Sequence, residues 1–149
     1  MQTRAPIMNA FQTLIAHNIP QTFPKLRFAF VEAGASWVPY LVYNLRRARE
    51  RRPRLDADAG IAGPAYELAE NLVAGNRFYV TCQVDEDLPY ILKFTGEDNL
   101  MVGSDYSHSD PSQEGHVPTL LQERADRGDL SPIAVRKILW DNPKACYGL

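Results

Sequence analysis

One short segment carries residue types that could do acid–base or metal chemistry. In LMVGSDYSHSD, residues 100–110, an apolar run leads into Gly103, so that Asp105 falls at the end of a predicted strand. A carboxylate at a strand end can bind a divalent metal or act as general base for a metal-bound water. His108 follows three residues later, close enough to be a partner of Asp105 or a proton shuttle. On spacing alone, a capped turn after a buried strand is the favoured interpretation of the segment.

Two other predicted strands end in polar residues. Glu32 follows the apolar run in FVEAG, where its carboxylate could bind a metal, position a substrate, or form an ion pair with Arg27 or Arg77. Cys82 lies near the end of RFYVTCQ, and no histidine stands beside it in the sequence. We therefore interpret Cys82 as a buried strand residue rather than a nucleophile.

The remaining histidines and the arginine cluster have plainer interpretations. His17 is expected at a helix C-terminus, where it complements the helix dipole, and His116 is expected in a loop. Six arginines lie between Arg46 and Arg54, without interleaved aromatic residues and with acidic residues just after them. This pattern favours a solvated helix end over a nucleic-acid site.

Composition limits the function classes further. The chain has 149 residues, 45% of them hydrophobic and 23% charged, which is typical of one soluble domain. Its net charge of -2 indicates no global attraction to nucleic acid or anionic membranes. Its two cysteines lack metal-site spacing, there is no apolar run of membrane-spanning length, and no signal peptide is recognisable. A cytoplasmic location and reduced thiols are expected by default.

The apolar periodicities predict strands and helices in alternation. Strands are predicted within residues 26–31, 77–83 and 99–104, and helices over 5–17, 37–49, 66–74, 88–95, 119–127 and 132–140, with a turn over 56–64 and a helix stop before Pro143. Three successive strand–helix units predict parallel strands with crossover helices, either in a doubly wound sheet or in part of a barrel. Because a complete eight-unit barrel takes ~250 residues, the pattern indicates an incomplete one.

Taken together, three stretches resemble one family. These are the amidohydrolase-related (β/α)8 proteins of amidohydrolase family 2, the metal-dependent hydrolases and decarboxylases grouped with aminocarboxymuconate semialdehyde decarboxylase. The stretch FPKLRFAFVEAGASWVPYL resembles the region around the sixth strand of these proteins. The stretch NLMVGSDYSHSD resembles their eighth strand and the loop after it. The stretch AVRKILWDNPKACYGL resembles their closing helix. The resemblance implies that residues 1–149 are a single domain, the C-terminal part of a TIM-type barrel with about strands six to eight.

The resemblance also implies roles for particular residues. The family's eighth-strand aspartate binds the metal and handles the proton of the bound water, and it corresponds to Asp105. Tyr106 and His108 match the family pattern S/T-D-Y-P-H, with Ser107 in place of proline. Glu32 stands where many relatives carry a histidine that contacts the water or substrate.

The family's other metal ligands have no counterpart in this sequence. Neither the H-x-H after the first strand nor the fifth-strand histidine is present, while zinc needs about three or four protein ligands. The resemblance therefore implies a zinc-type hydrolase or decarboxylase of a small molecule, acting at a carboxylate, amide or ester carbon, of which this chain holds one part. It implies a homo-oligomer or pairing with the missing N-terminal barrel half. The alternative is a non-catalytic fragment or structural subunit.

Overall fold

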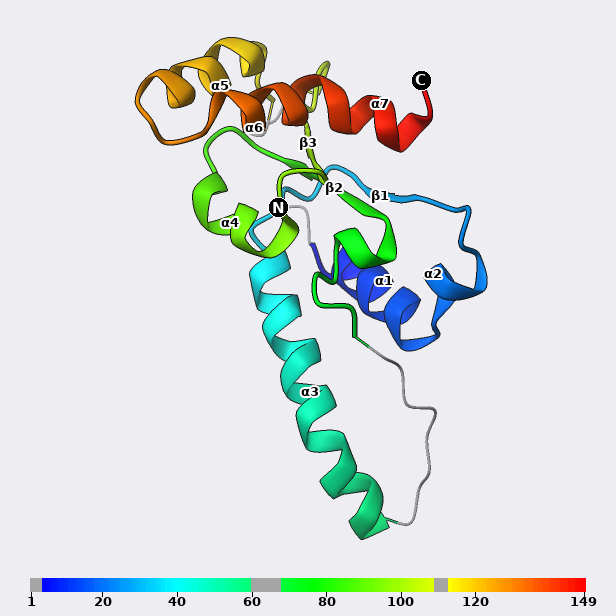
Figure 1. Ribbon diagram of the computed structural model, residues 1–149. Coiled ribbons are helices and arrows are strands. Elements are labelled where there is room, and N and C mark those ends of the chain that lie inside the picture. Colours follow the sequence, from blue (N-terminus) through cyan, green and yellow to red (C-terminus); the bar gives the residue numbers. More distant parts are fainter. Residues whose placement is uncertain (1–3, 60–67, 109–112) are drawn as a thin grey trace.

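A computed structural model describes residues 4–59, 68–108 and 113–149 of the chain (Figure 1). Helices and strands alternate along it, as the periodicities predict. The elements are α1 (Ala5–Ala16), α2 (Ile19–Thr22), β1 (Phe28–Phe30), α3 (Val38–Ala59), the 3₁₀ turn η1 (Ala74–Asn76), β2 (Phe78–Cys82), α4 (Leu88–Thr95), β3 (Leu100–Val102), α5 (Val117–Asp126), α6 (Pro132–Arg136), the π-helical turn η2 (Lys137–Asp141) and α7 (Asn142–Tyr147).

The described strands form one parallel sheet in the order β1-β2-β3. Phe28 pairs with Phe78 in the first ladder, and Val80 pairs with Leu100 in the second. A parallel pair needs a crossover connection, and α3 and α4 lie in the two connections. The predicted parallel α/β arrangement is therefore confirmed, and the carboxyl ends of all three strands lie at one edge of the sheet.

Aromatic residues from α1, β1, β2 and the loop before α3 form the centre of the core. The ring of Phe11 in α1 lies 5.3 Å from that of Phe30, 5.4 Å from that of Trp37 and 5.0 Å from that of Phe78, measured between centroids. These rings are tilted or edge-on to one another, the arrangement that aromatic quadrupoles favour. Because Phe11 has no exposed surface, α1 is bound firmly to the sheet despite preceding it in the chain.

Side-chain caps fix the start of two helices. The Asp87 carboxylate accepts a hydrogen bond of 3.1 Å from the Tyr90 N–H at the start of α4, and Ser131 Oγ accepts one of 2.9 Å from the Ala134 N–H at the start of α6. Gly96 ends α4 with a φ of 71°, a value that glycine adopts without strain.

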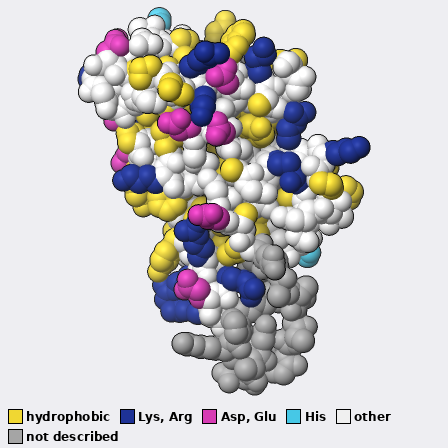
Figure 2. Space-filling view, in the orientation of Figure 1, with side chains coloured by type: hydrophobic (Ala, Val, Ile, Leu, Met, Phe, Trp, Pro, Cys, Tyr) yellow, Lys and Arg dark blue, Asp and Glu magenta, His cyan; other side chains and the backbone are white. Residues whose placement is uncertain are grey.

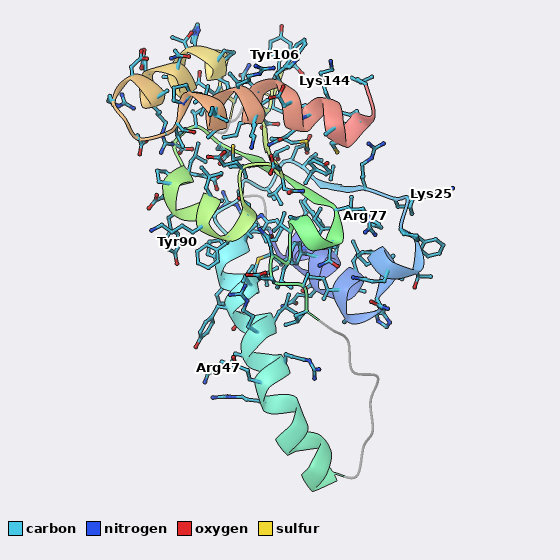
Figure 3. All side chains as sticks on the ribbon, viewed as in Figure 1. Lys25, Arg47, Arg77, Tyr90, Tyr106 and Lys144 are labelled. Carbon is cyan, nitrogen blue, oxygen red and sulfur yellow. The ribbon has the colours of Figure 1, made fainter. Side chains whose placement is uncertain are left out.

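Helix α3 is longer than predicted. It continues past residue 49 to Ala59, so the turn predicted from residue 56 and the helix-end interpretation of the arginine cluster are both wrong over the described residues. Arginine, glutamate and alanine are strong helix formers and favour the continuation, whereas Pro53 opposes it. Figure 1 shows its second half extending away from the sheet. Arg47 projects from it with its guanidinium donating to the Tyr43 hydroxyl (Figure 3).

The helix predicted over 66–74 is also wrong where the structure describes it, from residue 68. Asn71 Oδ1 accepts hydrogen bonds from the Val73 and Ala74 N–H groups, at 2.9 and 3.0 Å. A side chain that binds nearby backbone in this way competes with helical hydrogen bonds. The segment therefore turns, and only the short η1 follows.

The C-terminal helix does not stop before Pro143, as was expected. It passes through η2 and continues as α7 to Tyr147, with Pro143 in the first turn of α7. Proline normally clashes with the carbonyl four residues earlier in a helix, and the wider π turn directly before it provides the space. None of the described helices is long and apolar enough to cross a membrane. The single domain over 1–149 and the cytoplasmic location stay predictions.

Truncating the central aromatic residue tests this core. We expect Phe11→Ala to lower the free energy of unfolding by about 3–5 kcal/mol, because it removes a fully buried ring and leaves a cavity among three others. Urea denaturation followed by circular dichroism measures the change. Phe23→Ala is the matched control, since Phe23 is 50% exposed, and it should cost about 0.5 kcal/mol or less. Equal losses in the two variants would contradict the proposed centre of the core.

Candidate functional site

A pocket of about 260 Å³ lies at the carboxyl edge of the sheet. Residues at or just after the carboxyl ends of all three strands line it, as expected where parallel strands end together. Its lining comprises Val31, Glu32, Gly34, Thr81, Cys82, Gln83, Gly103, Asp105, Tyr106 and His108. The structure thus brings Glu32, Asp105 and His108, the predicted site residues, into one cavity. Tyr106 lies beyond β3 with 80% of its surface exposed (Figure 3).

Asp105 and His108 contact each other directly. Asp105 Oδ1 lies 2.6 Å from His108 Nδ1, and the His108 backbone N–H donates to the Asp105 carbonyl at 3.2 Å. Because a carboxylate only accepts, the imidazole Nδ1 must carry the hydrogen, which leaves Nε2 for exchange with a ligand or solvent. Only 13% of the Asp105 side chain is exposed, against 52% for His108. The pair can therefore move a proton between the pocket and solvent.

Three non-glycine residues around the pocket have a left-handed backbone. Their φ angles are 62° at Glu32, 49° at Asp105 and 74° at Ser107. Aspartate tolerates this conformation better than glutamate or serine, because its short side chain can bind nearby backbone. Such outliers cost roughly 1–3 kcal/mol each and concentrate at functional sites.

Glu32 is exposed at the rim of the pocket. The two arginines considered as ion-pair partners instead donate to backbone carbonyls, Arg27 to Ala145 and Arg77 to Leu26. Among the described residues no ion pair of Glu32 is found, which leaves its carboxylate available to the pocket.

Cys82 lines the pocket as a buried free thiol. Burial, followed by the nearby Glu86 carboxylate, raises the pKa of Cys82 to about 12. A thiol is a nucleophile only as the thiolate, so Cys82 stays protonated and unreactive at neutral pH. The interpretation of Cys82 as a buried strand residue agrees with this environment.

A buried residue that was not predicted, Glu86, stands behind the pocket. Its side chain accepts hydrogen bonds from the Ala35 and Ser36 N–H groups, the Ser36 hydroxyl and the Gln83 N–H, at 2.6–2.9 Å. Glu86 lies between Asp85 and Asp87, and nothing in the sequence distinguishes it from two ordinary helix-capping candidates. Its partners lie up to 51 residues away, beyond any local pattern.

The residues present do not form a metal centre by themselves. Within residues 4–59, 68–108 and 113–149, no group of three or more histidine, cysteine, aspartate or glutamate side chains is placed to hold a metal ion. Zinc needs about three or four such ligands. Asp105 and His108 lie together, but they supply only part of that number.

Comparisons with known proteins bear on the family and the fold of the chain. The family model described as Amidohydrolase matches residues 3–149. Among solved structures, the crystal structure of an amidohydrolase from Mycobacterium avium subsp. paratuberculosis K-10 is similar, with a TM-score of 0.68, 22% sequence identity and 93% of this chain covered. The present chain spans 32% of the length of that protein. A search of the curated proteins finds no match. The predicted partial barrel is therefore confirmed.

Relieving the backbone strain at Glu32 tests the left-handed conformation. Glu32→Gly should raise the free energy of unfolding by about 0.5–1 kcal/mol relative to Glu32→Ala, because both variants lose the carboxylate but only glycine relaxes at a φ of 62°. Thermal denaturation of the two variants measures the difference. If Glu32→Ala were as stable as Glu32→Gly, the backbone at this position would not be left-handed.

Proposed function

Because the chain belongs to the amidohydrolase family, we propose that it forms part of a hydrolase that acts on a small molecule with an ester, amide or related carbon. The observation that supports this proposal is the contact of 2.6 Å between Asp105 and His108 in a pocket at the carboxyl ends of parallel strands. A histidine and a carboxylate in this arrangement are a general acid–base pair. Glu32, at the rim of the same pocket, is proposed to position the substrate or the water.

In the proposed reaction, Asp105 is the general base. Its carboxylate accepts a proton from water as the water oxygen attacks the carbonyl carbon. The bond from that carbon to the alcohol or amine then breaks, and the leaving group takes up the proton that Asp105 accepted. His108 holds the Asp105 carboxylate through Nδ1 and exchanges protons with solvent through Nε2.

A divalent metal, with zinc the predicted one and Asp105 as a ligand, would supply Lewis-acid activation of the water. Since the described residues do not complete such a site, the steps above use only the side chains of this chain. Zinc would need further ligands from outside the described residues. Decarboxylation, which the resemblance to the decarboxylase subgroup implies, uses the same aspartate and also stays a prediction.

Hydrolysis of simple probes tests the proposal. We expect the purified chain, assayed with and without added Zn²⁺ or Mn²⁺, to hydrolyse at least one of a chromogenic ester, an anilide and a lactone. Asp105→Asn should slow that reaction by about 10²–10⁴-fold, because it removes the general base. Asp126→Asn is the matched control, since Asp126 is an exposed carboxylate on α5, and should leave the rate unchanged.

Two outcomes would contradict the proposal. If Asp105→Asn and Asp126→Asn had the same rate, the reaction would not use Asp105. If the chain hydrolysed none of the probes, the alternative of a structural part without catalytic activity would be favoured. The assay thus separates the two interpretations of the family match.

We also propose that the chain associates through the outer edge of β1. Among the described strands, β1 lies at one side of the sheet, and its middle residue Ala29 is exposed. The Phe28 N–H donates to the Arg77 carbonyl on the β2 side, so the alternation of a parallel ladder turns the Ala29 N–H to the outer side. An exposed edge of this kind is a template for another strand, here from a second copy of the chain.

Removing that N–H tests the association. Ala29→Pro should shift the purified chain toward the monomer in sedimentation velocity, because proline cannot donate to an added strand, while the β1–β2 ladder is retained. Ala29→Val, which keeps the N–H, should associate like the unsubstituted chain. A chain that sediments as a monomer without any substitution would exclude pairing between copies and leave pairing with the missing barrel strands.

A further inference from the structure

The loops that border the pocket are held by one carboxylate. The β1–α3 loop (residues 31–37) and the β2–α4 loop (residues 83–87) are far apart in the sequence, yet both donate to the Glu86 side chain. Ala35 and Ser36 donate from the first loop and Gln83 from the second, with N···O distances of 2.8–2.9 Å. Hydrogen bonds to an ionised carboxylate are roughly twice as strong as neutral ones.

Neighbouring residues hold both the side chain and the backbone of Glu86 in place. Gly34 has a φ of 63°, and a Cβ atom there would lie only 2.6 Å from Glu86 Oε1, so a larger residue would displace the carboxylate. From the other side, Arg124 of α5 donates to the Val84 and Glu86 carbonyls at 2.7 and 2.8 Å. The backbone and the side chain of Glu86 are therefore both fixed.

We propose that Glu86 is a positioning residue, an internal anion that sets the shape of the pocket by fixing its two loops. Gly34 and Gln83 both line the pocket, and Glu32 lies two residues before Gly34. Glu86 itself does not line the pocket and acts through these neighbours. The role of the pocket in hydrolysis rests on the function proposed above, whereas the positioning can be tested without any substrate.

A carboxylate is the side chain that this arrangement requires. Its oxygens accept hydrogen bonds from three backbone N–H groups and one hydroxyl. Because all four partners are donors, the side chain at this position has only to accept. Glutamine would turn an NH₂ group, a donor, toward some of the same N–H groups. Glu86→Gln therefore removes the interaction with little change in shape, and Glu86→Ala removes it and leaves a space.

Chemical rescue with acetate provides the test. In two-dimensional ¹H–¹⁵N spectra, Glu86→Gln and Glu86→Ala should move the amide protons of Ala35, Ser36 and Gln83 upfield and speed their hydrogen exchange by about tenfold. Acetate supplies the carbon and the carboxylate that the alanine variant lacks. Added acetate should restore those resonances saturably in Glu86→Ala, whereas chloride at the same ionic strength should not.

Matched variants separate positioning from a general loss of stability. Acetate should have no effect on Glu86→Gln, whose side chain fills the space, and Glu123→Gln, on the exposed side of α5, should leave the three amides unchanged. The Glu32 amide resonance should shift together with those three. The His108 amide, in the loop between β3 and α5, should not shift. Gly34→Ala should reproduce the effect with the carboxylate present, because its Cβ displaces that carboxylate.

Wild-type resonances for Ala35, Ser36 and Gln83 in both Glu86 variants would overturn the proposal. So would equal responses of both variants to acetate. If Glu86→Ala does not fold alone, recovery of the folded spectrum with acetate supports the proposal; without recovery, Glu86→Gln and Gly34→Ala decide it. A chain that shows the rescue but hydrolyses no probe would contradict only the proposed function.

Discussion

The parallel pairing of the strands is the constraint on which the rest of the structure depends. Parallel neighbours must be joined by long crossovers, so α3 and α4 are required to return the chain to the opposite edge of the sheet. The same pairing places the ends of β1, β2 and β3 side by side. Residues separated by more than 70 positions in the sequence, such as Glu32 and Asp105, therefore share one pocket. The proposed site lies at that edge because parallel pairing brings the carboxyl ends of all three strands together there.

Around this edge, the chain combines strained backbone conformations with fully hydrogen-bonded buried side chains. Asp105 and Ser107 hold an unfavourable backbone conformation that brings Asp105 to His108, while nearby Glu86 has every contact that a buried carboxylate needs. Among the described residues, no buried side-chain nitrogen or oxygen lacks a hydrogen-bond partner. Strain of this kind persists only where the surrounding structure fixes it, and the contact between Asp105 and His108 is part of that support.

Local signals in the sequence were sufficient for the features that depend on local physics. The boundaries between apolar runs and polar residues located Glu32 and Asp105 at the ends of predicted strands. Long-range features were not accessible in this way. Glu86 has its role through Ala35 and Ser36, about fifty residues earlier, and a run of three acidic residues does not reveal which one turns inward. On the face shown in Figure 2, basic and acidic side chains are likewise interspersed over the described residues.

Because of the π turn, the orientation of the end of the C-terminal helix depends on the number of residues in that turn. Residues Lys137–Asp141 contain one more residue than an α-helical turn would need, and each residue rotates a helix by about 100°. Loss of a single residue there would convert the turn to ordinary α-helix and swing Cys146 and its neighbours in α7 off the core. Insertions and deletions, rather than exchanges of side chains, are therefore the changes to which this helix is most sensitive during evolution.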